Sequence, residues 1–407
     1  MTDPHQKYRE GKESVERAVE DGNICVRDKD LIFELCAAYD SNDSTTPLPS
    51  TGKWANDTKP KEITTLHYWT QHLKRVALRL GFEPYDTTLS DADADVINEL
   101  MKDSRTGVHP DVKDGGFANN TIRNQQCCCR RFYRYHEHLG VEPTDINLTK
   151  GDGTYLDPVD MLTKEEIGQI REVADHPRDL ALFDILLYTG QRNTAVRSLR
   201  IKDVDLQAGV YRLNTDADGL KGADKHGTKR PLLGAVGSIR AWLNSHPFPD
   251  TPDAYLITPL PDFSTPDPHR MVSTNTLNYA LKNMKRDASI DKPLTAHTLR
   301  HNFVTLAKRE YGIDDSTVKY LIGHRPESQV METTYAHLSD DDFLHSAEES
   351  AGICDPANIS SLSPDECHCG ASLSANAKAC ERCGTVYTPD AYTARLHIAE
   401  GMQETYR

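Results

Sequence analysis

Apolar residues recur at every third or fourth position in four segments of the first third of the chain, a spacing typical of amphipathic helices. The four segments are residues 30–39, 62–82, 93–103 and 119–140. This pattern predicts an all-helical first domain over residues 28–140, preceded by a leader over residues 1–27.

A polar stretch with Pro and Gly and without periodicity covers residues 141–158 and predicts a linker. A second domain is expected over residues 159–350. It opens on Thr163 and Glu166, whose spacing is that of a capping box at the start of a helix. The chain is thus long enough for two compact domains before its C-terminal segment begins.

The second domain alternates helical and extended patterns. Residues 179–190 predict a buried helix that ends at Gly190, and helical periodicity returns after Ser273. Short strands around a Gly-rich hairpin are predicted for residues 201–206, 209–215 and 229–233. The predicted fold class is therefore mainly α with a small antiparallel β-sheet.

The C-terminal segment carries two cysteine pairs, each followed by Gly, after a Ser-, Pro- and Asp-rich linker over residues 351–365. Paired knuckles of this kind bind tetrahedral Zn²⁺. We therefore predict a structural zinc ribbon over residues 366–388, followed by a tail over residues 389–407. Since few apolar residues surround its cysteines, we expect the ribbon to be a separate unit folded by its metal. The first pair is one residue shorter than the usual Cys-x-x-Cys, so His368 or Cys354 remains an alternative ligand. The predicted ligands are Cys367, Cys369, Cys380 and Cys383.

Acidic residues outnumber basic residues, 62 against 47, which gives a formal net charge of −15. This balance argues against non-specific attraction to a polyanion such as nucleic acid. A nucleic-acid partner stays possible if a basic face is segregated from the acidic surface, or if the whole surface is adapted to high salt. Neither a membrane helix nor the apolar core of a secretory signal is recognisable. We expect a cytoplasmic protein without a membrane partner.

Two helices of the predicted first domain combine basic and aromatic residues. Such a combination suits contact with a nucleic-acid backbone, where Arg and Lys meet phosphates. The alternative is that the aromatic rings face the core while the basic side chains extend along the surface to water. The candidate DNA-binding residues are Lys74, Arg75, Arg79, Arg123, Arg130, Arg131 and Arg134.

The second domain lacks the motifs of P-loop enzymes, zinc proteases and serine hydrolases. It carries instead a set of reactive residues spread over its length. Each member alone is common on solvated helix faces and at helix ends, so the set is informative only as a whole. The members are Arg192 after a helix-ending Thr-Gly, Lys225 in the Gly-rich hairpin, His297 and Arg300 three apart on one helix, His324 after a Gly, and Tyr335 eleven residues later.

These motifs, in this order and after a helical domain, resemble the tyrosine recombinase (phage integrase) family, whose members cut and rejoin DNA. The resemblance spans about residues 28–350, and the C-terminal ribbon resembles an appendage of some archaeal members. It implies a helical, SAM-like core-binding domain and an α+β catalytic domain. It also implies double-stranded DNA as the partner of a homo-oligomer, a dimer or tetramer in a synaptic complex, and chemistry that needs no metal and no ATP.

The resemblance further implies a role for each motif residue. Guanidinium groups suit the non-bridging oxygens of a phosphodiester, where negative charge grows in the transition state. A phenol needs a base or flanking cations to ionise, because its ordinary pKa is about 10. The implied roles are Tyr335 as the nucleophile that forms a 3′-phosphotyrosine, Arg192 and Arg300 as the phosphate clamp, Lys225 as the acid that protonates the leaving 5′-oxygen, His297 as the acceptor of the tyrosine proton, and His324 as a phosphate donor.

Two departures from the family pattern bear on these roles. The family usually has an acidic residue three positions after the first Arg, where this chain has Ala195, so Asp203 is the candidate replacement. The hairpin also contains Lys221 and Lys229, although the spacing to the following Arg-Pro-Leu favours Lys225 as the acid.

Other residues near the motifs are predicted to be structural. Tyr188, Tyr311 and Tyr320 are interpreted as packing residues, and His301 as a packing residue or a hydrogen-bond donor to its neighbours.

The leading functional hypothesis is a site-specific recombinase. A type IB topoisomerase-like relaxing enzyme shares the same residue types, and a catalytically silent DNA-binding protein is a third possibility. The helical first domain favours the recombinase, and the complete set of reactive residues argues against the silent protein.

Overall fold

The chain divides into two compact units, Thr2–Thr154 and Tyr155–Arg407, each with its own hydrophobic core. In the part that the structure describes, no helix combines the length and apolar character needed to cross a bilayer. The structure, a computed structural model, describes residues 4–41, 60–152, 160–217, 220, 229–260, 265–309, 313–324, 327–328, 363–374, 377–388, 391–392 and 394–395.

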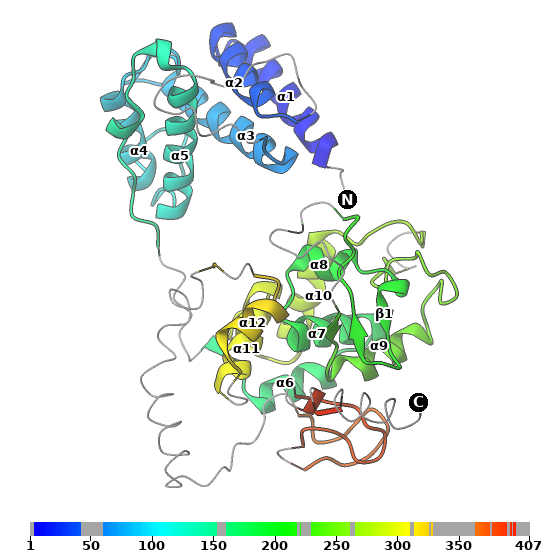
Figure 1. The fold of residues 1–407 in the computed structure, drawn as a ribbon. Coiled ribbons are helices and arrows are strands. Elements are labelled where there is room, and N and C mark those ends of the chain that lie inside the picture. The colour runs from blue at the N-terminus through cyan, green and yellow to red at the C-terminus, as the bar shows by residue number, and fades with distance from the viewer. Residues whose placement is uncertain are drawn as a thin grey trace, which may run out of the picture. The chain divides into compact units, whose positions relative to one another are not determined.

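In its described residues the first unit is built from helices, as the sequence pattern predicts (Figure 1). Its helices bury the apolar faces that the three-to-four spacing produces, including Leu66, Leu73 and Leu80 along one side of the third helix. The elements are α1 (Pro4–Glu20), α2 (Val26–Ala38), α3 (Ile63–Leu80), α4 (Ala94–Thr106), α5 (Asn119–Tyr135), and the short 3-10 helices η1 (Glu137–Leu139) and η2 (Pro143–Asp145).

Helix α1 occupies most of the segment that the sequence analysis assigns to a leader. Tyr8 and Ala18 are buried and belong to the same core as α2, α3 and α5. Gly11 faces α3 so closely that a Cβ there would lie 2.9 Å from the ring of His67. The N-terminal segment is therefore part of the helical unit.

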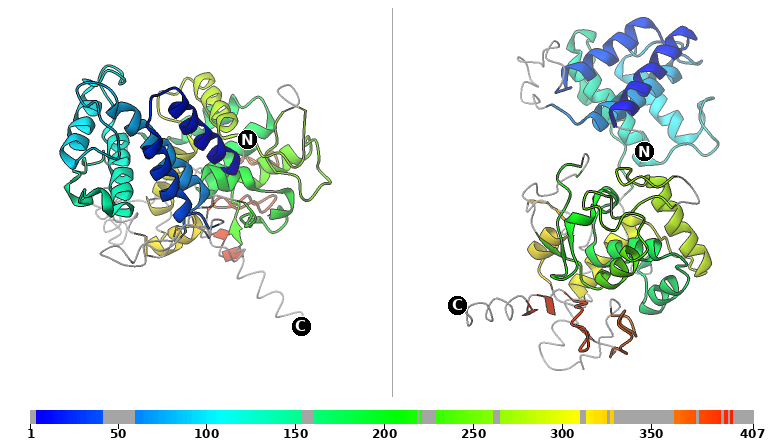
Figure 2. Two further views of the ribbon diagram at one scale, coloured as in Figure 1. Left: turned by 90° about the horizontal axis from the view of Figure 1, so that it is seen from above. Right: turned by 90° about the vertical axis from the view of Figure 1, so that its right-hand side faces the viewer.

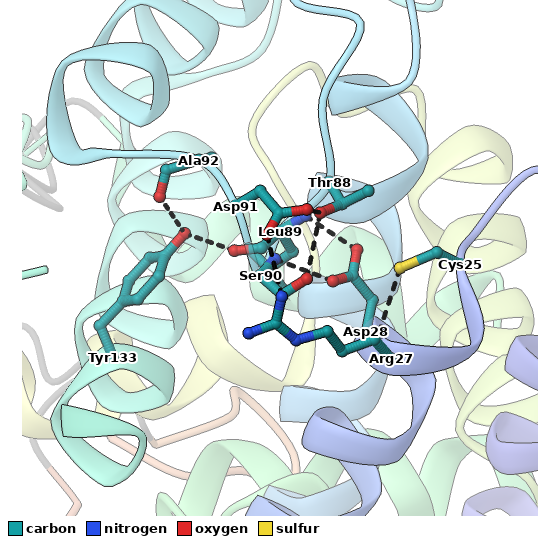
Figure 3. Close-up of polar contacts among 9 residues, drawn as sticks. All are labelled: Cys25, Arg27, Asp28, Thr88, Leu89, Ser90, Asp91, Ala92 and Tyr133. Carbon is teal, nitrogen blue, oxygen red and sulfur yellow. Dashed lines mark hydrogen bonds and ion pairs between the residues drawn. The ribbon is translucent and has the colours of Figure 1, made fainter. Parts of the chain in front are cut away.

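A buried carboxylate fastens α2 to the loop before α4 (Figure 3). Asp28 is 1% exposed, and its two oxygens accept hydrogen bonds from the backbone N–H groups of Leu89 and Ser90, both at 2.8 Å. Tyr133 of α5 donates to the carbonyl of Leu89 at 2.7 Å. Helix α2 thus binds two backbone amides of the loop, and α5 binds one of the loop's carbonyls.

We expect Asp28→Ala to lower the free energy of unfolding of the first unit by about 2–4 kcal/mol, because two buried N–H groups lose a charged acceptor. Urea denaturation followed by circular dichroism measures the change. Asp28→Asn keeps one acceptor oxygen and should cost less than Asp28→Ala. Equal stability of Asp28→Ala and the unsubstituted protein would contradict this role.

The second unit combines helices with one small three-stranded antiparallel sheet in the order β1-β2-β3, which confirms the predicted fold class. The capping box at Thr163 and Glu166 is present, with hydrogen bonds of 3.3 and 2.8 Å. The elements are α6 (Lys164–Glu172), α7 (Pro177–Thr189), α8 (Asn193–Ser198), η4 (Ile201–Asp203), β1 (Val204–Asp205), β2 (Val210–Tyr211), β3 (Arg230–Pro231), α9 (Ala235–Leu243), α10 (Thr274–Asp287), α11 (Ala296–Arg309) and α12 (Asp315–Leu321).

Helix α7 is the centre of this unit, since almost every residue from Ala181 to Thr189 is buried. It ends at Gly190, whose φ of +58° is a left-handed conformation that favours glycine. A Cβ on Gly190 would lie 2.5 Å from the ring of Phe303 on α11. Glycine therefore lets the end of α7 and the middle of α11 approach closely.

The C-terminal cysteine segment packs against the second unit rather than standing apart from it (Figures 1 and 2, orange and red). Val386 and Tyr387 are 6% and 2% exposed and belong to the same hydrophobic core as α7 and α9. The segment is also tied by an ion pair between Lys164 and Asp365 at 2.9 Å. The ribbon therefore does not stand as a separate unit, contrary to the expectation from the sequence. Its apolar partner surface on α7 lies about 200 residues earlier in the sequence, so the local composition gives no sign of it.

Candidate functional site

Four of the six predicted catalytic residues lie in the described part, on three separate segments of the second unit. Arg192 is the residue immediately before α8, and His297 and Arg300 lie on α11. His324 follows α12 after a glycine turn. Lys225 and Tyr335 fall outside the described residues.

The end of α12 is where these segments meet. A helix ends with carbonyl groups that have no partner within the helix, and cations are favoured near them. Here four consecutive carbonyls each accept a side-chain hydrogen bond, two of them from predicted catalytic arginines. The donors are Arg230 Nε to Tyr320 O (3.3 Å), Gln191 Nε2 to Leu321 O (2.6 Å), Arg300 Nη1 to Ile322 O (2.8 Å) and Arg192 Nη1 to Gly323 O (3.4 Å).

Arg300 also joins α12 to the end of α7. Its Nη1 atom donates to the carbonyl of Gly190 at 2.7 Å, and the residue is only 4% exposed. The close approach that Gly190 permits is thus what puts α7, α11 and α12 around one guanidinium group. Arg192, two residues after Gly190, reaches the same turn from the α7 side.

The two histidines of the site are held neutral near pH 7. Burial, followed by the positive charges of Arg300 and Arg192, lowers the pKa of His324 to about 4. Burial and the same two arginines lower the pKa of His297. A neutral imidazole has one nitrogen that accepts a hydrogen bond and one that donates, so either ring can contact an oxygen atom held beside the two fixed positive charges.

His297 also contacts a further histidine on the next turn of α11. The Nε2 atoms of His297 and His301 lie 2.9 Å apart, so one ring donates a hydrogen bond to the other. His301 is 4% exposed. His301 is therefore a hydrogen-bonding neighbour of His297. This is one of the two roles expected for it from the sequence.

Two sequence expectations about neighbouring residues are wrong. Asp203 accepts a hydrogen bond from the backbone N–H of Arg200 at 2.8 Å, so this carboxylate closes its own turn, while Arg192 bonds to a backbone carbonyl. Tyr320 is 45% exposed, and its hydroxyl donates to the carbonyl of Lys229 at 3.1 Å, so it is not a packing residue. Tyr188 is a core residue, as predicted, and Tyr311 falls outside the described residues.

The structure divides the candidate DNA-binding residues of the first unit. Arg79 is 4% exposed and bonds to Gln125 at 3.2 Å, which makes it a structural residue. Arg131 lies over the rings of Tyr39 and Trp69, at 5.5 and 5.2 Å from their centroids. The others are Lys74 beside Ser14, Arg75 and Arg123 at exposed positions, Arg130 bonded to the carbonyl of Ile146, and Arg134 at a half-buried position.

The four predicted cysteine ligands form one cluster. Their sulfur atoms all lie within 4.8 Å of one another, and two pairs, Cys367–Cys383 and Cys369–Cys380, are 3.5 and 3.6 Å apart. Tetrahedral coordination with bonds of about 2.3 Å places thiolate sulfurs about 3.8 Å apart. The cluster therefore fits a tetrahedral metal ion. His368 lies between this cluster and α9, with its Nδ1 3.5 Å from the Cys367 sulfur and its Nε2 3.2 Å from Arg240, and Cys354 falls outside the described residues.

Sequence reasoning missed Gln191 and Arg230 as parts of this site. Gln191 is 3% exposed and adjoins the Thr-Gly-x-Arg motif in sequence, which was the available signal. Arg230 adjoins the hairpin lysines in the same way. Both act through backbone carbonyls of α12, and carbonyl acceptors have no signature in a sequence.

Comparisons with known proteins find similarity over part of this chain. The model of the phage integrase family matches residues 160–342. Over 162 residues the chain is 28% identical to tyrosine recombinase XerD of Pseudomonas putida. The aligned segment is 40% of this chain and 50% of that protein. Over 225 residues it is 25% identical to tyrosine recombinase XerA of Saccharolobus solfataricus. Here the aligned segment is 55% of this chain and 65% of that protein. The chain thus spans about half to two thirds of the length of these curated relatives.

Among solved structures, the chain is similar to a lambda integrase dimer bound to a COC′ core site, with a TM-score of 0.48 and 16% identity over 67% of this chain and 72% of that one. The family match covers the segments that carry Arg192, His297, Arg300 and His324, which are the described members of the candidate site. Residues 160–342, a little under half of the chain, therefore match the model of the phage integrase family.

Proposed function

We propose that the protein is a site-specific tyrosine recombinase that cleaves and rejoins DNA through a 3′-phosphotyrosine intermediate. The observation that carries the proposal is the convergence of Arg192, Arg300 and His324 on the end of α12, with His297 subject to the same two charges. Two fixed guanidinium groups beside neutral imidazoles suit a phosphodiester whose negative charge increases during reaction.

In this proposal the Tyr335 oxygen attacks the phosphorus atom, and the bond between phosphorus and the 5′-oxygen breaks. His297 takes the phenol proton, and Lys225 gives a proton to the leaving 5′-oxygen. Arg192 and Arg300 turn from backbone carbonyls toward the non-bridging oxygens, and His324 donates a hydrogen bond to one of them. Rejoining is the reverse reaction, with a 5′-hydroxyl as the nucleophile and no other energy source.

The experiment that tests the proposal uses nicked suicide duplexes of randomised central sequence, from which the 5′-hydroxyl fragment diffuses away after cleavage. We expect a protein–DNA adduct that survives denaturing electrophoresis. Strand transfer between two labelled duplexes distinguishes a recombinase from a topoisomerase-like enzyme, which would only relax supercoiled plasmid. DNA binding without any adduct would favour the silent DNA-binding alternative.

We further propose that the active form on DNA is a homo-oligomer and that the first unit contributes to duplex binding. Exchange between two duplexes needs one nucleophile for each cleaved strand, which a single chain with one Tyr335 does not supply. The exposed side chains of Arg75 and Arg123 support phosphate contacts by the first unit.

The metal that the cysteine cluster would hold is proposed to be zinc, coordinated by Cys367, Cys369, Cys380 and Cys383. Four thiolates at tetrahedral spacing favour Zn²⁺ over the hard cations that prefer oxygen ligands. When bound, the ion would supply folding free energy to the ribbon.

Chelation of this metal should lower the melting temperature of the second unit by about 5 °C or more, because Val386 and Tyr387 pack in its core. Differential scanning calorimetry with and without chelator measures the shift, and Cys380→Ser should reproduce it without chelator. Metal analysis should find one zinc ion per chain. An unchanged melting temperature for both would mean that the ribbon and the core are not thermodynamically coupled.

A further inference from the structure

The strand that leaves the Gly-rich hairpin is fastened to α12 by reciprocal contacts between Tyr320 and two consecutive residues, Lys229 and Arg230. The Tyr320 hydroxyl donates to the carbonyl of Lys229 at 3.1 Å, and Arg230 Nε donates to the carbonyl of Tyr320 at 3.3 Å. The Arg230 guanidinium also lies over the Tyr320 ring, 5.4 Å from its centroid. We call this set of contacts the Arg230–Tyr320 staple.

Arg230 is a charged residue at a buried position of the sheet. It is 2% exposed, and its Nη1 atom has no hydrogen-bond partner in the structure. A buried guanidinium with an unsatisfied N–H group is costly. On β3 it lies opposite Tyr211 of β2, so the sheet fixes its backbone while α12 fixes its side chain.

The staple connects two parts of the site whose relative position matters for the chemistry. At one end it holds the carbonyl of Tyr320, the first of the four carbonyls that accept from Arg230, Gln191, Arg300 and Arg192. At the other end it holds the carbonyl of Lys229, the last residue before β3. Lys225 lies four residues before this anchor in the sequence.

We propose that Arg230 and Tyr320 are positioning residues that hold the general-acid hairpin beside the arginine clamp. The proposal rests on the proposed function, since it assigns these two residues to the proton donor of that reaction. It differs from a purely structural role because Tyr320 is nearly half exposed, so its hydroxyl contributes little to stability. The staple therefore serves the placement of the hairpin.

The test replaces the leaving 5′-oxygen by sulfur, because a thiolate leaves without being protonated and makes a general acid unnecessary. Single-turnover cleavage is measured on the oxygen and sulfur substrates for Arg230→Met and Tyr320→Phe. Lys225→Ala is the reference for loss of the acid. Tyr255→Phe, in the loop between α9 and α10, is the matched deletion of a tyrosine hydroxyl. Tyr320→Phe removes only one hydroxyl at an exposed position, so it remains informative if Arg230→Met unfolds.

On the oxygen substrate we expect Tyr320→Phe to be slower by about three- to tenfold, the kinetic equivalent of one hydrogen bond, and Arg230→Met by at least as much. On the sulfur substrate both should return to within about twofold of the unsubstituted protein, as Lys225→Ala should. Tyr255→Phe should match the unsubstituted protein on both substrates.

Persistent slow cleavage of Arg230→Met and Tyr320→Phe on sulfur, with Lys225→Ala rescued, would overturn the staple while leaving the proposed function intact. A normal rate for Tyr320→Phe on oxygen would overturn it as well. If no hairpin lysine variant is rescued, the general-acid assignment in the proposed function fails, and the staple fails with it.

Discussion

Replacing Arg300 by alanine should lower the rate of DNA strand cleavage by about 10²–10³-fold, the range typical of a lost transition-state donor. The guanidinium group is 4% exposed and lies where the ends of α7 and α12 meet, so its charge is little screened by water. Arg192→Ala should have an effect of similar size. Single-turnover cleavage of a suicide duplex, expressed per folded molecule, measures both.

Arg197→Ala is the matched control for removal of a buried arginine. Arg197 is 3% exposed and donates to the carbonyl of Val272 at 2.7 Å, so its loss should reduce stability. Its cleavage rate per folded molecule should stay within about threefold of the unsubstituted protein, because no charge of the clamp is lost. Effects below threefold at both Arg192 and Arg300 would contradict the clamp assignment.

Replacing Tyr335 by phenylalanine should abolish the covalent protein–DNA adduct altogether, because the phenol oxygen is the proposed nucleophile. Duplex binding, measured by fluorescence anisotropy at fixed salt, should remain within about twofold, because only one hydroxyl is removed. Tyr255→Phe serves again as the matched control and should form the adduct normally. An undiminished adduct from Tyr335→Phe would assign the chemistry to a different residue.

Most of the helical architecture could be predicted from periodicity, while α1, α8 and α9 were not expected from the sequence. Helices α2 to α5 each bury enough apolar residues at regular spacing to be recognised. In α1 the buried positions are Tyr8, Gly11, Val15 and Ala18, separated by charged residues. Their spacing of three, four and three was the available signal, but a glycine and an alanine contribute little to an apolar pattern.

The site shows a similar division between what side chains reveal and what the backbone adds. The motif residues Arg192, His297, Arg300 and His324 stand out in the sequence. The structure bonds both arginines to the turn after α12, and their charges lower the pKa of both histidines. Their acceptors at the end of α12 could not, because any residue can provide a backbone carbonyl. For the same reason a carboxylate, Asp203, was expected as the partner of Arg192, whose acceptor is a backbone carbonyl.

The cysteine segment illustrates a limit of composition. Few apolar residues surround the four cysteines, which favoured an independent ribbon held together by its metal alone. The structure buries Tyr387 against the core of the second unit, to which Tyr188 also belongs. Such packing between distant segments depends on the tertiary fold, and local composition does not report it.

The central claim is that this chain breaks DNA by forming a bond to Tyr335. The most direct measurement traps the protein on a suicide duplex, digests the adduct with protease and nuclease, and identifies the modified residue by mass spectrometry. We predict a nucleotide joined through its 3′-phosphate to the peptide that contains Tyr335. Attachment to another tyrosine, such as Tyr320, or the absence of any nucleotide-linked peptide in cleaved samples, would contradict it.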